Sequence, residues 1–264
     1  MGPLQRYQLD LEGNAITADD AQRALVGHLQ NLYEQIVQTE SNNLGPLGWL
    51  KQRLFASEQV AGPIQGLYIW GGVGRGKTYL MDLFFESLPS DSKLRTHFHR
   101  FMQRVHSDLA SLQGQKNPLE HVAEQIAAES RVLCFDEFFV RDIGDAMILA
   151  GLLDALFKRQ VILIATSNIE PDRLYEDGLQ RQRFLPAIAL IRKYTATIAI
   201  DSGADYRLRS LTQATLYHCP ISQDTDGQLM GCFNELTQRG SKVHKGAEIE
   251  ILKRRIGTQY CSKD

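Results

Sequence analysis

The segment GGVGRGKT, from Gly71 to Thr78, carries four glycines in its first six positions and ends in a lysine and a threonine. It matches the phosphate-loop pattern G-x-x-x-x-G-K-[ST] in full, and it lies between an apolar run and a segment with helical spacing. Glycines let consecutive backbone N–H groups turn around phosphate oxygens, and the start of the next helix adds partial positive charge. The pattern therefore predicts a site for nucleotide phosphates rather than an ordinary glycine-rich turn.

Two side chains of this segment are expected to act on the ligand directly. Lys77 is expected to reach the β- and γ-phosphates of ATP, and the hydroxyl of Thr78 is expected to bind Mg²⁺. The residues predicted to surround the nucleotide are Gly71, Gly72, Val73, Gly74, Arg75, Gly76, Lys77, Thr78 and Tyr79.

A pair of acidic residues follows the apolar run RVLCF. Asp136 can hold a metal ion, and Glu137 can orient and deprotonate an attacking water. Alone, such a pair could simply cap the next helix. Together with the phosphate loop it predicts hydrolysis of ATP. The additional strand-like run KLRTHF between the two motifs favours an ATPase over a simple nucleotide kinase.

Three more polar residues complete the predicted catalytic set. Asn168 ends the run VILIATSN and could position the lytic water, provided that this strand lies between the strands of the two motifs. Arg181 and Arg183 follow at the expected start of a helix, where an arginine from a neighbouring subunit can complete the outer side of the γ-phosphate. Because residues at i and i+2 face different sides of a helix, only one is expected to serve. Arg183 is preferred, and Arg181 is the second choice.

Short apolar runs alternate with helical segments, as is typical of a parallel sheet covered on both faces. The expected strands are 66–70, 93–98, 131–135, 161–165 and 195–200. The expected helices between them are 77–88, 101–113, 118–129 and 142–159. The alternation predicts an α/β fold with a P-loop core, in which a central parallel five-stranded sheet is flanked by helices.

Residues 1–60 are expected to form a helical N-terminal extension to this core. Apolar spacing predicts a helix over 17–38, with Thr17 and Asp20 as an approximate capping box. A second helical pattern, WLKQRLFAS, follows a Gly/Pro break.

The ATPase core is assigned to 61–204, and 205–264 is read as an incomplete C-terminal segment. Within that segment, GQLMGCFNELTQ has helical spacing and AEIEIL is strand-like. The basic run 253–255 is interpreted as a solvated end.

His97 and His99 alternate along the expected strand KLRTHF, which is a spacing that two metal ligands can use. No third ligand is recognisable nearby. A structural role is preferred, in which Phe98 and Phe101 pack inward.

Composition limits the function classes. The formal net charge of -2 does not favour general affinity for nucleic acid, and the four cysteines have no spacing typical of disulfides or zinc. The N-terminus has no signal or transit pattern, and no apolar run approaches membrane-spanning length. The chain is therefore expected to be soluble and cytoplasmic.

Six segments, in chain order, resemble the ZapE cell-division ATPases, the bacterial branch of the Afg-one-like AAA+ proteins. They are GLYIWGGVGRGKT, HFHRFM, CFDEFF, ATSN, LYEDGLQRQRFLP and DYRLR, and they extend from about Gly66 to Arg209. Two departures accompany the likeness. Phe139 stands where many members have glutamine, and members continue well beyond Asp264, so a C-terminally truncated chain is expected.

The resemblance implies an ATP-hydrolysing AAA+ protein that uses ATP and Mg²⁺ and assembles with itself when full length. It also implies action on filaments of FtsZ in the division ring, and a cytoplasmic location with possible peripheral recruitment to the inner membrane at the division site. Related organellar members are linked to membrane-protein subunits, so a chaperone for such subunits is one alternative. A helicase-loader or initiator-like nucleic-acid ATPase is another, which the near-neutral charge does not favour.

Overall fold

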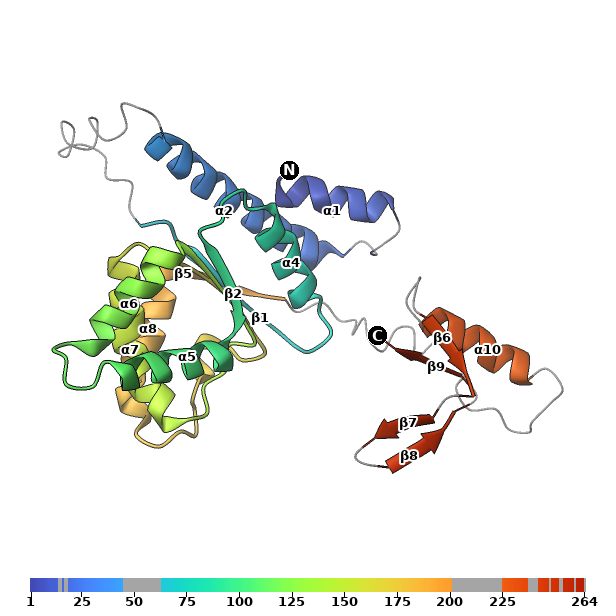
Figure 1. Ribbon diagram of the computed structural model, residues 1–264. Coiled ribbons are helices and arrows are strands. Elements are labelled where there is room, and N and C mark those ends of the chain that lie inside the picture. Colours follow the sequence, from blue (N-terminus) through green and yellow to red (C-terminus); the bar gives the residue numbers. More distant parts are fainter. Residues whose placement is uncertain are drawn as a thin grey trace. The chain divides into compact units, whose positions relative to one another are not determined.

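The computed structural model describes residues 1–13, 16, 19–44, 63–200, 225–236, 242–246, 248–251, 254–258 and 260–263 (Figure 1). The chain forms two compact units, Met1–Gly203 and Ala204–Asp264.

A parallel sheet of five strands forms the centre of the first unit, and its spatial order is β2-β3-β4-β1-β5. The strands are β1 (Gly66–Trp70), β2 (Lys93–His97), β3 (Val132–Asp136), β4 (Ile162–Ser167) and β5 (Thr195–Ala199). The predicted α/β class and the parallel five-stranded sheet are confirmed. Every residue of β3 and β4 is buried, because helices cover both faces of the sheet there, which explains their continuous apolar sequences.

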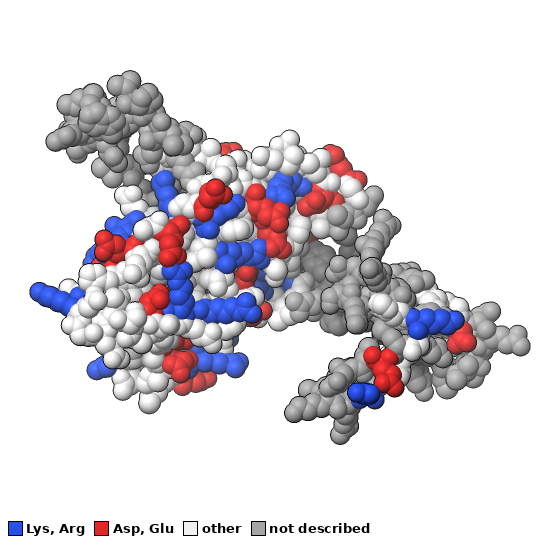
Figure 2. Space-filling model, in the orientation of Figure 1, with Lys and Arg blue, Asp and Glu red and all other residues white. Residues whose placement is uncertain are grey.

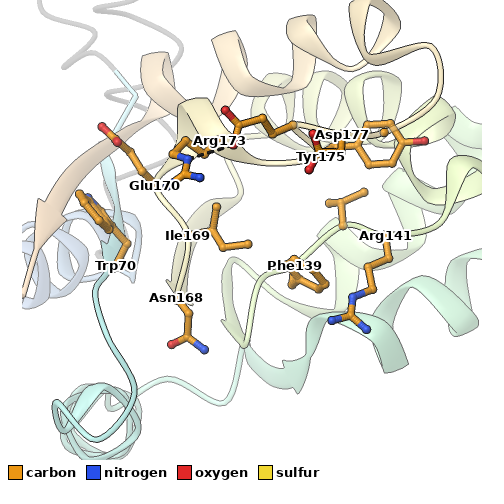
Figure 3. Close-up of a pocket in the computed structure, with 12 residues that line it drawn as sticks. Trp70, Phe139, Arg141, Asn168, Ile169, Glu170, Arg173, Tyr175 and Asp177 are labelled. Atoms are coloured by element: carbon orange, nitrogen blue, oxygen red, sulfur yellow. Dashed lines mark hydrogen bonds and ion pairs between the residues drawn. The ribbon is translucent and has the colours of Figure 1, made fainter. Parts of the chain in front are cut away.

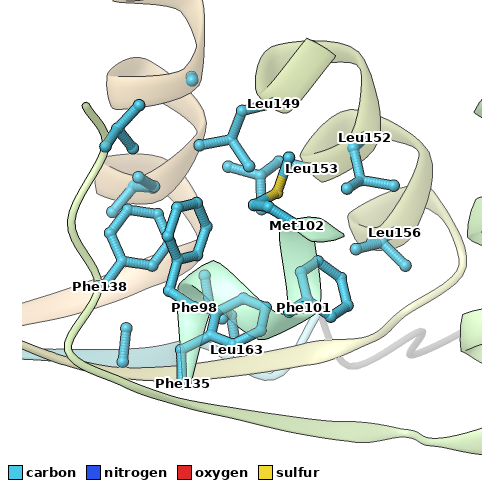
Figure 4. Close-up of a cluster of buried hydrophobic side chains, with 14 of the residues drawn as sticks. Phe98, Phe101, Met102, Phe135, Phe138, Leu149, Leu152, Leu153, Leu156 and Leu163 are labelled. Carbon is cyan, nitrogen blue, oxygen red and sulfur yellow. The ribbon is translucent and has the colours of Figure 1, made fainter. Parts of the chain in front are cut away.

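Four helices and their connections cover one face of the sheet (Figure 1). These helices are α5 (Phe98–Ser111), α6 (Pro118–Glu129), α7 (Ile143–Lys158) and α8 (Leu185–Tyr194). Aromatic rings fill the space between α5 and the sheet: Phe98 packs against Phe135 of β3 and lies 4.4 Å, centroid to centroid, from Phe138 (Figure 4). Leu153 of α7 belongs to the same core and packs on the side of these rings away from the sheet.

The other face is covered by α4 (Lys77–Ser87) together with the N-terminal helices α1 (Pro3–Glu12) and α2 (Asp20–Leu44) (Figure 1). Leu25, Leu29 and Ile36 of α2 are fully buried in a core that they share with Ile69 of β1 and Phe84 of α4. The N-terminal helices thus pack on the sheet that carries the phosphate loop.

The start of α2 differs from the expected capping box. Asp19 caps the helix, because its Oδ1 accepts a hydrogen bond of 2.8 Å from the backbone N–H of Gln22. Thr17 and the predicted helix WLKQRLFAS lie outside the described residues. None of the described helices is long and apolar enough to cross a membrane, including α2 with its 25 residues.

The predicted start of α5 is wrong: the helix begins three residues earlier than expected, and β2 ends one residue earlier. The strand ends at His97 and the helix already begins at Phe98, so His97 and His99 do not share a strand face. Their rings stack with centroids 5.9 Å apart. Among the described residues no group of three or more His, Cys, Asp or Glu side chains is arranged to hold a metal. Phe98 and Phe101 are buried, as the structural interpretation of this segment expected.

The second unit contains one helix and two antiparallel strand pairs among its described residues. The helix is α10 (Thr225–Leu236); β6 (Lys242–Lys245) pairs with β9 (Tyr260–Lys263), and β7 (Glu248–Ile251) pairs with β8 (Arg254–Gly257). Arg254 and Arg255 of the basic run lie in β8, where they pair with Ile251 and Glu250 of β7. The Arg255 side chain is exposed, as expected for a solvated run.

Gly66 begins β1 where the backbone of β4 leaves no room for a side chain. A Cβ atom at this position would lie 1.9 Å from the carbonyl oxygen of Leu163. We expect Gly66→Ala to lower the free energy of unfolding by about 3 kcal/mol or more, because the two central strands must separate to accept it. Gly27→Ala is a matched control. Its Cβ would meet nothing within 4 Å, and the better helix propensity of alanine should raise stability by about 0.5–1 kcal/mol.

Urea titrations followed by circular dichroism measure both effects. Equal midpoints for Gly66→Ala and the unmodified protein would contradict the packing argument.

Candidate active site

The predicted motifs meet at the carboxyl edge of the parallel sheet. β4 pairs with β1 on one side and with β3 on the other. Asp136 at the end of β3, Asn168 after β4 and the phosphate loop after β1 therefore lie at the same edge. Strand β4, which ends just before Asn168, therefore lies between the strands of the two motifs, as the prediction for Asn168 required. That Asn168 positions the lytic water stays a prediction.

Backbone conformation explains two of the glycines in the phosphate loop, and close packing explains a third. Gly74 and Gly76 have φ of 79° and 80°, in the left-handed region that glycine adopts without cost. Gly71 is required for a different reason: a Cβ there would lie 2.3 Å from the carbonyl oxygen of Ile200. Helix α4 begins directly after Gly76, so the loop ends at the positive end of a helix.

Lys77 lies over this loop. Its Nζ donates hydrogen bonds of 2.7 Å to the carbonyl oxygens of both Gly71 and Gly72. The ammonium group is thereby held at the mouth of the loop, where an incoming phosphate can replace carbonyl oxygens as its acceptor.

Arg75 carries the clearest sign that the loop fits an anion. Its Nε and Nη1 atoms are buried and have no hydrogen-bond partner among the described residues. The Nε atom lies close to Gly72, since a Cβ at that glycine would be 3.5 Å away from it. Buried guanidinium donors without an acceptor are energetically costly. A bound phosphate group would supply the hydrogen-bond acceptor that these donors lack.

The N-terminal helix α2 supports the loop from outside. Gln22 is 5% exposed, and its Nε2 donates to the carbonyl oxygen of Arg75 at 3.3 Å. A Cβ at Gly76 would lie 2.7 Å from the same Nε2 atom. This contact joins residues 53 positions apart, and nothing in the local pattern around Gln22 predicts it.

The carboxylate of Asp136, predicted to bind metal, is held by an arginine that the sequence patterns did not single out. Arg95 of β2 places its Nε 2.7 Å from Oδ2 of Asp136 and its Nη2 3.3 Å from Oδ1. Its Nη1 donates to Asp82 of α4. Burial disfavours the charged form of Arg95, but the hydrogen bonds to Asp136 and Asp82 outweigh it and raise the pKa of the guanidinium.

These residues fit a magnesium ion bound together with nucleotide. Mg²⁺ is usually held by one or two carboxylates with phosphate oxygens and waters, and a hydroxyl at the start of the P-loop helix. Asp136 and Thr78 are donors of the required types at the same edge of the sheet.

Glu137 has an unusual backbone conformation. Its φ is 53°, which is uncommon for a residue other than glycine and is frequent at functional sites. The turn is fixed from β4, since Thr166 accepts hydrogen bonds from Glu137 N–H at its Oγ1 and from Phe138 N–H at its carbonyl oxygen. The carboxylate side chain is left exposed beside buried Asp136 and Phe138.

A pocket of about 500 Å³ adjoins these motifs (Figure 3). Trp70 at the end of β1, Phe139 after Glu137 and Asn168 after β4 belong to its lining, so it opens at the same edge as the phosphate loop. The guanidinium of Arg141 lies over the ring of Phe139 in a cation–π contact, with its Cζ 4.6 Å from the ring centroid.

The two candidate arginines have different surroundings. Both lie in a short 3-10 helix (Arg181–Arg183) directly before α8, not in α8 itself. Arg181 donates from Nη2 to the carbonyl oxygen of Asp172 at 2.5 Å and is partly buried. The Arg183 side chain is exposed and makes no hydrogen bond or ion pair within the described part of the chain, while its backbone N–H donates to the carbonyl oxygen of Gln180 at 2.9 Å. The next residue, Phe184, is fully buried and anchors this segment.

A phosphate loop, an Asp-Glu pair one strand away and a central parallel sheet in the order β2-β3-β4-β1-β5 together define a P-loop ATPase with the AAA+ type of core. The sequence profile of the AFG1-like ATPases matches residues 1–264, and the chain belongs to this family.

Relatives agree with this assignment over most of the chain. The chain is 45% identical to the cell division protein ZapE of Escherichia coli strain K12 over 262 residues, which cover 97% of this chain and 69% of that protein. It is 39% identical to lactation elevated protein 1 homolog B of Danio rerio over 206 residues, 74% of this chain and 41% of that protein.

Among solved structures, AMPPCP-bound DnaA from Aquifex aeolicus is similar with a TM-score of 0.49 and 12% identity, covering 85% of this chain and 64% of that one. DnaI is similar with a TM-score of 0.43 and 20% identity, covering 60% and 81%.

Proposed function

We propose that this ATPase couples the hydrolysis of Mg²⁺-bound ATP to the remodelling of a protein partner in bacterial cell division, and that the partner is FtsZ. The observation that carries the proposal is the 45% identity to a cell division protein over 97% of the chain. The proposal includes assembly into a homo-oligomer and recruitment to the inner membrane at the division site.

Each binding and catalytic role in the proposed reaction is assigned to particular side chains. Lys77 and Arg75 would bind phosphate oxygens, and Thr78 and Asp136 would hold the metal. When bound, Mg²⁺ neutralises charge on the phosphates and orients them. Glu137 takes a proton from the attacking water, and Asn168 hydrogen-bonds that water and the γ-phosphate. Arg183 supplies a positive charge to the site of a neighbouring subunit.

The charge distribution supports a protein partner over nucleic acid. On the face shown in Figure 2, basic and acidic side chains are interspersed over the described surface. Proteins that bind nucleic acid nonspecifically usually present a basic patch or stripe instead.

Co-sedimentation with FtsZ polymers tests the partner. We expect the protein to pellet with polymers in the presence of a slowly hydrolysed ATP analogue and to be released with ADP. Liposomes carrying a membrane-protein subunit, and a single-stranded DNA of matched charge, serve as competing ligands. Nucleotide-dependent binding to either of these, without binding to FtsZ polymers, would replace the proposed partner.

Loss of the phosphate-loop lysine tests the nucleotide site separately. We expect Lys77→Ala to weaken ATP binding at least about 100-fold, because charge-assisted contacts to two phosphates are lost. Lys158→Ala is the control: Lys158 pairs with Asp154 on the surface of α7, and its removal should leave the affinity unchanged. A fluorescent ATP analogue measures both. Unchanged affinity in Lys77→Ala would contradict the assignment of the loop.

A further inference from the structure

Arg95 engages both oxygens of the carboxylate that is assigned to the metal. The Nε–Oδ2 and Nη2–Oδ1 distances, 2.7 and 3.3 Å, describe a two-pronged contact between a guanidinium and Asp136. The side chains of Arg95 and Asp136 are 18% and 13% exposed, so water screens this pair only weakly. A metal ion that binds Asp136 must therefore compete with a cation that is already in place.

Asp82 gives the guanidinium a second anchor. It lies on α4, the helix that starts at the phosphate loop, and its Oδ1 accepts a hydrogen bond from Nη1 of Arg95. The Asp82 side chain is 48% exposed, far more than that of Asp136. The cation can consequently keep an ion pair at the rim of the site when the inner carboxylate is taken by metal.

We propose that Arg95 is a positioning residue that holds Asp136 when no metal is bound and yields it to Mg²⁺ while remaining paired with Asp82. The inference rests on the proposed nucleotide site and adds a control of its metal dependence. Arg95 keeps the buried carboxylate compensated between turnovers, and it raises the Mg²⁺ concentration at which nucleotide binds. The exchange also links metal binding to β2, which leads directly into α5.

The test compares the Mg²⁺ dependence of nucleotide binding in Arg95→Gln and in the unmodified chain. A fluorescent ATP analogue is titrated at a series of Mg²⁺ concentrations and in EDTA. The Mg²⁺ midpoint is the Mg²⁺ concentration at which nucleotide binding is half-maximal. We expect this midpoint to be lower by about tenfold or more in Arg95→Gln, since Mg²⁺ no longer displaces a pair of charge-assisted hydrogen bonds. Thermal unfolding without ligand should occur at a lower temperature in Arg95→Gln, because Asp136 and Asp82 lose their shared cation.

Arg104→Gln is the matched control. Arg104 is also ion-paired, to Glu129 at 2.6 Å and to Asp108 at 3.5 Å, but it lies on α5 and contacts no residue of the candidate site. Its replacement should leave the Mg²⁺ midpoint unchanged.

A midpoint in Arg95→Gln equal to or above that of the unmodified protein overturns the proposal. If Arg95→Gln does not fold, Arg95→Lys decides, because an ammonium group cannot hold two carboxylates in a fork and should also lower the midpoint. An unchanged midpoint in the lysine variant then overturns it. Failure of the nucleotide site is distinguishable, since the unmodified protein would then show no Mg²⁺-dependent binding at all.

Discussion

Arg183→Ala is expected to lower the rate of ATP hydrolysis by about 10³-fold or more while ATP binding is retained, because a trans arginine acts on charge that develops in the transition state. Arg183 is exposed, and fully buried Phe184 fixes the backbone beside it. Arg181, in contrast, already donates to the carbonyl oxygen of Asp172 in its own subunit. The surroundings thus favour Arg183 over its neighbour for contact with another copy of the chain.

Mixing two inactive variants tests the role across subunits. Arg183→Ala protein contributes intact phosphate loops, and Lys77→Ala protein contributes intact arginines, so mixed assemblies should recover part of the ATPase activity. Arg181→Ala is the matched control and should retain most of the rate. Full activity of Arg183→Ala alone at saturating ATP and protein concentrations would refute the assignment; loss of activity in Arg181→Ala only would transfer it to that residue.

Glu137→Gln is expected to bind ATP normally and to hydrolyse it about 10²–10⁴-fold more slowly, because the amide keeps the shape of the side chain and loses its basicity. The fold should be unaffected, since the Glu137 side chain is exposed and the hydrogen bonds that fix its turn come from the backbone. The trapped ATP state should promote assembly and partner binding.

Rapid-quench measurement of a single turnover separates chemistry from product release. Glu124→Gln is the control, because Glu124 is an exposed glutamate on α6 that belongs to no part of the candidate site. Turnover of Glu137→Gln within about threefold of the unmodified protein would assign water activation to another group, given the far larger cost of losing a general base.

The sequence by itself determined the nucleotide class of site and the elements that carry it. The phosphate loop is contiguous, and its glycines, lysine and threonine act within eight positions, so the pattern can be read without long-range contacts. The five strands were predicted to within two residues at each end, and β3 and β4 were the easiest to recognise because buried strands are largely continuous apolar runs. Segments were less predictable where tertiary packing moved a boundary, as at Phe98, whose ring joins the aromatic core against Phe135 and starts a helix earlier than the spacing indicated.

Only the tertiary structure decided which separate segments meet. The strand order brought Asn168 between the two motifs, and local patterns do not encode which strands are neighbours. Arg95 reaches Asp136 across 41 positions, and Gln22 reaches the phosphate loop across 53. An arginine in a strand and a glutamine in a helix have ordinary sequence surroundings. Their roles arise because parallel pairing of β2 with β3, and packing of α2 beside α4, place their polar ends at the one edge where the site forms.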